Sequence, residues 1–377
     1  MRTRLGALFD AFLPVLATLA ALLVGAIMLV FLNINPIEAY KALWIGAFGT
    51  TNAFAETLVK ATPLLLVGLG ICISFRGDVI NIGGEGQMII GAILATWVGL
   101  TFTESPGWLI ITVAMVMGFI GGAIWGGIPG FLKAYFNVNE ILSTVMMNAI
   151  AVQLMNFLLR GPMIDPSQAE LASKIPQTAR LIDAFHLERW SPTRLHAGAL
   201  IAVVLAFLVY VLLWRTTWGY RIRAVGQNPN ASRYAGIKVP RYIVLALLLS
   251  GAFAGLAGAV QVYGVNYRMI TDGSSSGFTG SAGFNGIVAA LFGQLHPIWS
   301  IPASILFGAL LVGANSMQRA IQVPSALITA LNGLVVVFVV SSEIWRKRRQ
   351  RRRLSAARED EPPSKPDPSQ VQKEAAQ

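Results

Sequence analysis

The chain has 377 residues, of which 55% are hydrophobic and only 12% are charged. A soluble domain of average composition carries about 25% charged residues, so this composition excludes an ordinary soluble protein and predicts an all-α polytopic membrane protein. The 29 basic and 18 acidic residues leave a net charge of +11. The positions of these basic residues along the chain bear on the membrane topology.

Ten apolar segments nearly free of charge are expected to cross the membrane as helices. The first follows Arg2 and Arg4 but is longer than the apolar stretch of about 7 to 15 residues in a cleavable signal peptide, so we expect it to be retained. The eighth is short and is bounded by Gly283 and Pro297, which leaves a half-helix or re-entrant segment open as the alternative. In chain order the segments cover residues 14–32, 57–75, 84–102, 108–132, 139–159, 196–214, 242–263, 283–295, 298–316 and 324–342.

The basic residues predict which side each loop faces. Placing the N-terminus inside puts 20 of the 29 basic residues in the cytoplasm. Five of the other nine lie in or beside a long loop at 160–195, where the positive-inside rule counts less. We therefore expect both termini in the cytoplasm, a transmembrane domain over 1–345, an extracytoplasmic loop at 160–195 and a cytoplasmic loop at 215–241.

The C-terminal segment begins with the basic run RKRRQRRR and continues in Pro, Ser, Glu, Lys and Gln. A stop-transfer cluster on anionic lipid followed by a disordered tail is the preferred interpretation of residues 346–377. A nuclear or RNA-binding signal is the alternative. Most other arginines flank apolar runs instead of forming a basic surface with polar surroundings, so no nucleic-acid partner is expected.

An internal symmetry relates two groups of four helices, helices 2–5 and 7–10. Five crossings separate the start of the two groups, so the second group is inverted relative to the first. Each group opens its second helix with a glycine-broken segment, NIGGEGQ at 81–87 and GSAGFNG at 280–286. Inverted repeats with interrupted helices are typical of a transporter's midplane site, although chance similarity among apolar residues is the alternative. The following residues recur at a constant offset at the start of the fourth helix: Val138, Leu142 and Thr144 as Val323, Leu327 and Thr329.

The cytoplasmic loop contains the signals of a short helix. Asn228 is a good N-cap, Pro229 suits the first helical position, and Gly236 can adopt the left-handed turn that ends a helix. A helix of about two turns is too short to be stable alone. The pattern therefore predicts a helix that docks into a groove on another protein.

The segment RAVGQNPNASRYAGI at 223–237 resembles the coupling helix of ABC importer permeases of the branched-chain amino acid and simple-sugar type. Together with SFRGDVINIGGEGQMIIGA, NVNEILSTVMMNAIA and GFNGIVAALFGQLHP, it more narrowly resembles the nucleoside-uptake permeases of that family, over residues 57–342. The family often has an acidic residue where this chain has Asn230, which leaves the polarity of the ATPase contact open. The residues that this resemblance assigns to ATPase coupling are Gly226, Asn228, Pro229, Asn230, Ala231, Arg233, Tyr234, Ala235 and Gly236.

The resemblance implies a transport subunit, not an enzyme, in a bacterial cytoplasmic (inner) membrane. Its expected partners are a second permease subunit, a cytoplasmic ABC ATPase that uses ATP and Mg²⁺, and an extracytoplasmic substrate-binding protein. The chain itself is expected to bind no cofactor, and it contains no G-x-x-x-x-G-K-[ST] phosphate loop. The implied substrate is a nucleoside or a related small polar solute, with a simple sugar or a branched-chain amino acid as alternatives.

Polar residues within the predicted spans are few and are therefore candidates for the translocation pathway. Those at 81–87 could instead serve helix packing through small residues, with Glu85 bonding to neighbouring amides. Asn139 and Glu140 could simply cap their helix, whereas residues 140, 144 and 148 share one helical face. Phe284 and Asn285 could stack on and hydrogen-bond to a planar base. The candidates are Asn81, Glu85, Gln87, Glu140, Thr144, Asn148, Phe284 and Asn285.

Other classes of function find little support. An ion-coupled secondary transporter should carry several membrane carboxylates or histidines, but only Glu85 lies clearly within a span. A membrane enzyme needs a catalytic cluster, and no two of the three histidines show metal-ligand spacing. Cys72 is the one cysteine, which excludes a disulfide framework and a cysteine-based metal site and is typical of a buried core residue.

Overall fold

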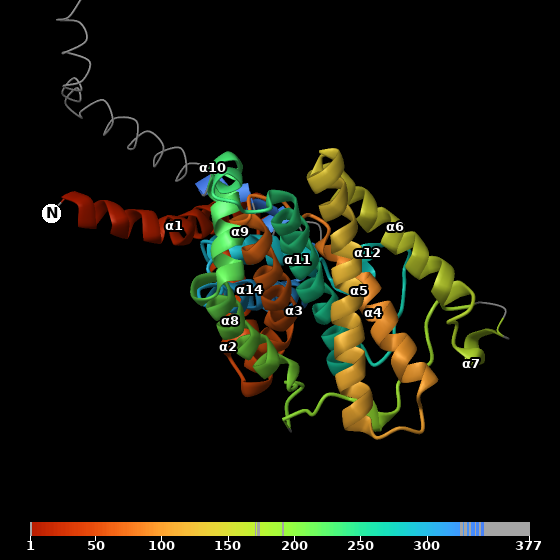
Figure 1. Ribbon diagram of the computed structural model, residues 1–377. Helices are drawn as coiled ribbons and strands as arrows, with labels where there is room; N and C mark the ends of the chain where they lie inside the picture. The colour runs from red at the N-terminus through yellow and green to blue at the C-terminus, as the bar shows by residue number, and fades with distance from the viewer. Residues whose placement is uncertain are drawn as a thin grey trace, which may run out of the picture.

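The computed structural model describes residues 2–324 except 170, 172, 173 and 191, with some further residues between 327 and 342, and Figure 1 shows a helical bundle. Within these residues there is no β-strand, only the isolated bridges Gln177–Ile270 and Arg189–His196. The predicted all-helical membrane fold is confirmed at this level. Six of the described helices are long and apolar enough to cross a membrane: α3 (Thr51–Arg76), α5 (Gly107–Phe136), α6 (Glu140–Arg160), α8 (Gly198–Arg215), α11 (Val239–Gln261) with its π-helical extension (Val262–Asn266), and α14 (Ser300–Ile321).

Four further helices belong to the predicted spans or to the chain between them. The helix α13 has 11 residues and is therefore about 16 Å long, roughly half of the hydrocarbon core, which agrees with the half-helix alternative. Eight of the 19 residues of the tenth predicted span, and all of 346–377, lie outside the described residues. These four helices are α1 (Arg2–Phe31), α2 (Pro36–Phe48), α4 (Gly84–Thr101) and α13 (Ala282–Phe292).

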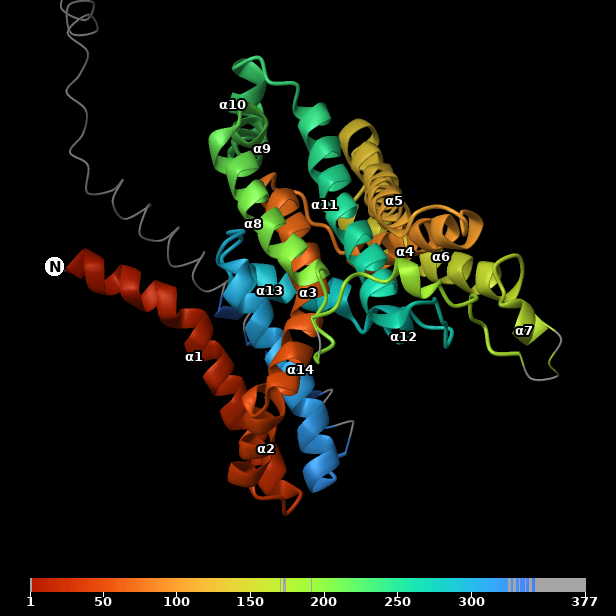
Figure 2. The same ribbon diagram turned by 90° about the horizontal axis from the view of Figure 1, so that it is seen from below.

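The helix α2 is not among the predicted spans. Its 13 residues are too few for a scan that seeks runs of about 20. The local signals are nevertheless present, because the Asn35 side chain accepts a hydrogen bond from the backbone of Ile37 at 3.0 Å and Pro36 occupies the first turn. The helix packs against α14 and α3, beside which it lies in Figure 2.

The centre of the bundle is the contact of α11 with α5, α4 and α3. Glycines make this contact close: a Cβ atom on Gly122 of α5 would lie 2.2 Å from the carbonyl oxygen of Gly251 on α11. A Cβ atom on Gly91 of α4 would lie 2.3 Å from the Cα atom of Gly255. Small residues at such interfaces let backbones approach and pack by van der Waals contact, as is usual between membrane helices.

We predict that Gly122→Leu strongly destabilises the protein, because the added side chain must separate α5 from α11. Overpacking of this kind costs about 3 kcal/mol or more. The matched control is Gly127→Leu on the same helix, where a Cβ atom would meet only the Leu248 side chain, at 3.9 Å. Melting of the detergent-purified protein should fall by several degrees for the first variant only, and equal melting of the two variants would contradict the packing account.

Two segments lie at opposite ends of α11. The helices α9 (Thr217–Gln227) and α10 (Pro229–Tyr234) precede the start of α11, and α10 is at the top of Figure 1. The segment before α8 instead contacts the far end, where the backbone N–H of Leu187 donates to the carbonyl of Tyr263 at 2.9 Å. The remaining short elements are α7 (Pro166–Ala169), a 3₁₀ turn (Asp183–Phe185) and α12 (Ser275–Thr279).

Candidate functional site

The glycine-broken segment at 81–87 is the polar centre of the bundle. Asn81 and Gln87 are buried, and the Asn81 amide nitrogen donates to the Gln87 side-chain oxygen at 2.9 Å and to the Ser250 hydroxyl at 2.8 Å. The Asn81 side-chain oxygen accepts from the backbone of Gly83 at 2.9 Å and from the Gln87 amide at 3.1 Å. These bonds fix the segment to α11, which carries Ser250.

The N-terminus of α4 is capped by another helix. Helix starts leave backbone N–H groups without intrahelical partners, and Gly83 supplies no side chain to cap α4. Asn148 of α6 takes this role, since its side-chain oxygen accepts from the Gly86 N–H at 2.8 Å. Its amide nitrogen donates to the Ile82 carbonyl at 2.9 Å, and Thr144 accepts from the Ile82 N–H at 3.4 Å. The polar face predicted on α6 thus contacts the broken segment at Thr144 and Asn148.

The N-terminus of α13 is capped in the same manner by Glu85 of α4. The preceding Ser281 makes no side-chain cap, and a Glu85 carboxylate oxygen accepts from the Phe284 N–H at 3.1 Å. The other oxygen accepts from the hydroxyl of Thr279 at the end of α12. A carboxylate at a helix N-terminus also interacts favourably with the helix dipole. Each half of the predicted symmetry therefore has a broken helix whose cap comes from elsewhere in the chain.

The two glycine-broken segments meet at this cap. A Cβ atom on Gly283 would lie 2.4 Å from the backbone nitrogen of Glu85, and one on Gly84 would lie 3.3 Å from the Cα atom of Gly283. Glu85 is only 1% exposed. We refer to Gly84, Glu85, Thr279, Gly283 and Phe284 as the α4–α13 junction. The polar groups of the junction hydrogen-bond to one another. This arrangement corresponds to the helix-packing alternative, in which Glu85 bonds to neighbouring amides.

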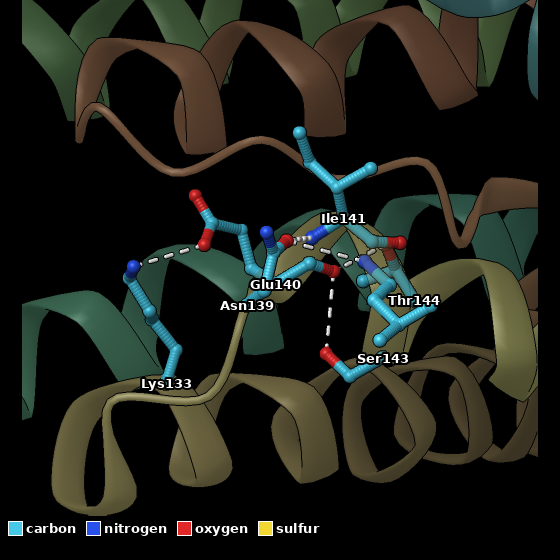
Figure 3. Close-up of polar contacts among 7 residues, drawn as sticks. Lys133, Asn139, Glu140, Ile141, Ser143 and Thr144 are labelled. Carbon is cyan, nitrogen blue, oxygen red and sulfur yellow. Dashed lines mark hydrogen bonds and ion pairs between the residues drawn. The ribbon is translucent and has the colours of Figure 1, made fainter.

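Glu140 lies apart from this centre. Its carboxylate pairs with the ammonium of Lys133 at 3.0 Å, across the turn from α5 to α6 (Figure 3). The side-chain oxygen of Asn139 accepts from the backbone of Ile141 at 2.9 Å and of Leu142 at 3.3 Å. The capping alternative is therefore confirmed for Asn139, and Glu140 occupies the first turn of α6.

Phe284 contributes its backbone N–H to the junction, and its ring is 47% exposed. Stacking on a base by Phe284 and hydrogen bonding by Asn285 remain predictions. Sequence reasoning missed two members of the polar centre, Ser250 and Thr279. Ser250 had a signal, as a hydroxyl within an apolar helix, whereas Thr279 lies in a run of small and hydroxyl residues with no distinctive spacing.

The predicted short helix is present as α10. The Asn228 side chain accepts from the Ala231 N–H at 3.0 Å, and Pro229 is the first helical residue. After the helix, Gly236 has φ +79°, a conformation that glycine adopts without strain. The Tyr234 side chain is 95% exposed. The predicted short helix between Asn228 and Gly236 is confirmed as Pro229–Tyr234, and its contact with an ATPase remains a prediction.

The end of α9 contacts the end of α3. A Cβ atom on Gly226 would lie 2.2 Å from the Arg76 carbonyl oxygen and 2.8 Å from the Gly77 carbonyl carbon. The Arg76 guanidinium donates to the carbonyls of Leu295 at 3.2 Å and Gln294 at 3.3 Å, just after α13. The polypeptide from α3 then enters the broken segment at 81–87. Through the end of α3, α9 is thus connected with the chain leading into α4 and with the chain leaving α13.

Among the residues that the structure describes, no three His, Cys, Asp or Glu side chains lie close enough together to hold a metal ion. Cys72 is buried, as predicted for a core residue, with its sulfur 3.4 Å from the Ser300 hydroxyl. His196 is buried, and its Nδ1 accepts from the Gly198 N–H at 3.2 Å. Cys72 and His196 are thus both buried and both in polar contact with a neighbouring residue.

Comparison with known proteins gives consistent matches. The family model described as "Branched-chain amino acid transport system / permease component" matches residues 53–340. The chain is 36% identical to a guanosine ABC transporter permease protein of Bacillus subtilis, over 87% of this chain and 92% of the relative. It is 33% identical to a glucose ABC transporter permease protein of Haloferax volcanii, over 89% and 88%, respectively. It is 30% identical to a nucleoside ABC transporter permease protein of Lactococcus lactis, over 86% and 89%.

In Lactococcus lactis and in Bacillus subtilis, a second permease protein named for the same substrate is also similar to this chain. No solved structure matches this chain at a comparable level.

Proposed function

Because this chain belongs to the family of permease components of branched-chain amino acid transport systems, we propose that it carries nucleosides or closely related small polar solutes. It is a multi-pass membrane subunit of an ABC transporter, and a transport component, not an enzyme. Such a subunit associates with an ATPase and a substrate-binding protein. The observation that carries the substrate proposal is the similarity over most of the chain to guanosine and nucleoside permeases.

A second candidate substrate is a simple sugar, which the 33% identity to a glucose permease favours. The substrate-binding protein of the system distinguishes the two. We expect guanosine or another nucleoside to raise the melting temperature of that protein, with no shift from glucose or leucine. A shift with glucose alone would overturn the nucleoside proposal in favour of the sugar.

The proposed complex pairs this chain with a second permease in a bacterial inner membrane, with both termini and α10 in the cytoplasm. The pairs of similar permeases in two organisms support the heterodimer. The excess of basic residues in the predicted inner segments supports the orientation. ATP and Mg²⁺ bind the ATPase, and this chain, without a phosphate loop, binds neither.

We place the pathway at the α4–α13 junction and the inverted repeats around it. Broken helices at matching positions of two repeats commonly form a transporter's midplane site. The structure has the Glu85, Asn81 and Gln87 side chains bonded internally, so a solute can reach them only after the junction opens. In the proposed cycle, exchange of these internal bonds for substrate contacts accompanies alternating access.

The coupling proposal assigns α10 to the ATPase and α9 to transmission. ATP-driven closure of the ATPase moves α10, and the contact of Gly226 with the end of α3 passes this motion to 81–87 and to 294–295. This assignment is supported by the close packing of the α9 backbone against the end of α3. The long loop at 160–195 is assigned to the face that receives the substrate-binding protein.

We predict that Tyr234→Asp weakens ATPase assembly without lowering the stability of this chain. The side chain is 95% exposed, so its loss removes contacts only from a partner, and burial of an unpaired carboxylate in an interface is unfavourable. Co-purification of the ATPase should fall about tenfold or more, since a buried aromatic contact is typically worth about 2 kcal/mol. Trp299→Asp, an exposed aromatic on another element, is the control; equal loss with both variants, or none with either, would refute the assignment.

A further inference from the structure

Three hollows that share lining residues lie where α5 ends and α9, α10 and α11 meet. Their volumes are about 340, 370 and 600 Å³, and Arg241 lines all three. Tyr242 and Arg221 line the first two, while Lys238 lines the second and third. We call this feature the basic groove, defined by Arg221, Lys238, Arg241 and Tyr242 at its polar end.

The polar end carries positive charge without compensation. No acidic residue lines any of the three hollows. Within the part of the chain that the structure describes, Arg221, Lys238 and Arg241 form no ion pair. Arg221 is held in place by a hydrogen bond from its guanidinium to the Tyr242 hydroxyl at 2.8 Å. Three cations around one hollow favour an anionic ligand with several oxygen acceptors.

The other end of the groove is apolar. Phe131 of α5 and Val244, Leu245 and Leu248 of α11 line the first hollow beside Arg221 and Arg241. Both helices are long and apolar enough to cross a membrane, and these side chains lie in the last turns of α5 and the first three turns of α11. The aromatic side chains Tyr135 and Trp218 also line the first hollow, and such residues concentrate at the membrane–water interface.

From this combination we propose that the basic groove binds an anionic phospholipid. The phosphate of the headgroup contacts Arg221, Lys238 and Arg241, and one acyl chain lies along Phe131, Val244, Leu245 and Leu248. Basic pockets between membrane helices bind anionic headgroups in this manner. An acidic protein surface would match the cations but would leave the apolar end of the groove unfilled. The lipid would contact α9, α10 and α11 together and so stabilise the arrangement of the cytoplasmic loop. This site does not depend on which solute the transporter carries.

The test uses the full-length chain, purified in a neutral detergent. Dioleoylphosphatidylglycerol should bind, as detected by native mass spectrometry, and should raise the melting temperature, whereas dioleoylphosphatidylcholine should do so far less. The triple variant Arg221→Gln, Lys238→Gln, Arg241→Gln should bind phosphatidylglycerol on the order of 100-fold more weakly, because each basic residue near anionic lipid contributes about fivefold. The double variant Lys238→Gln, Arg241→Gln, which keeps the Arg221–Tyr242 bond, should lose on the order of 25-fold.

The matched control removes three exposed cations elsewhere, Lys41→Gln, Arg160→Gln and Arg319→Gln, and should bind the lipid as the unaltered chain does. Equal loss in this control would overturn the site in favour of general charge attraction. Glycerol phosphate, which has the headgroup chemistry without acyl chains, should give no shift at the same concentration. An equal shift with glycerol phosphate, or an unchanged affinity in the double variant, would overturn the lipid proposal. Displacement of bound lipid by the ATPase alone would assign the groove to the protein partner instead.

Discussion

Replacing Glu85 by alanine is expected to lower both the melting temperature of the protein and solute uptake by the assembled transporter. The carboxylate is the cap of α13, and its removal leaves the partly buried N–H of Phe284 without an acceptor. A buried donor without a partner costs about 1–3 kcal/mol, and about 1.4 kcal/mol corresponds to a tenfold change in an equilibrium. We therefore expect uptake to fall about tenfold or more. The measurements are thermal melting and initial uptake rates in proteoliposomes.

Three comparisons make this prediction specific. Glu85→Gln keeps an oxygen for the Phe284 N–H and should be milder than Glu85→Ala. Because Glu85→Ala and Thr279→Val each remove the Thr279–Glu85 hydrogen bond, the double variant should cost less than the sum of the two single substitutions. Glu104→Ala, in an exposed loop, should change neither property. Normal stability and uptake in Glu85→Ala would show that the cap that Glu85 provides to α13 is dispensable.

Replacing Gly226 by valine is expected to separate ATP hydrolysis from transport. A side chain there must displace the backbone at Arg76 and Gly77, which costs about 1–3 kcal/mol by overpacking. It also moves α9 away from the element that leads into both broken helices. ATPase activity of the complex should remain, while solute transported per ATP hydrolysed should fall about tenfold. The two rates are measured on the same proteoliposomes.

Gly127→Val on α5 is the matched control for Gly226→Val. A Cβ atom on Gly127 would meet only the Leu248 side chain, at 3.9 Å. Transport per ATP should therefore stay near that of the unaltered chain. Normal coupling in Gly226→Val, with uptake and hydrolysis unchanged, would contradict the assignment of α9 to transmission.

The elements that the sequence predicts well are determined locally. The helix α10 follows from Asn228, Pro229 and Gly236, whose capping and turn preferences act within a few residues. The long spans follow from apolar runs, since each such run must satisfy its own backbone in lipid. The helix α2 was overlooked because it is shorter than a span, although Asn35 and Pro36 mark its start.

The polar centre could be predicted only in part. The glycines and polar side chains at 81–87 predict a break in the helix. The face shared by Thr144 and Asn148 follows from helical spacing. That Asn148 caps α4 and that Glu85 caps α13 depends on contacts between residues 62 and 199 positions apart. Local propensities contain no information on such pairings. Glu140 shares the face by spacing but pairs with Lys133, because the tight turn between α5 and α6 brings them together.

We expect this chain to be the membrane path of an ATP-driven nucleoside importer. The most direct test is accumulation of radiolabelled guanosine in proteoliposomes that contain this chain, its partner permease and the ATPase, with the substrate-binding protein supplied. We predict accumulation that requires ATP and is competed by unlabelled nucleosides, but not by excess glucose or leucine. Accumulation driven by an ion gradient without ATP, or uptake of sugar with none of guanosine, would contradict the account.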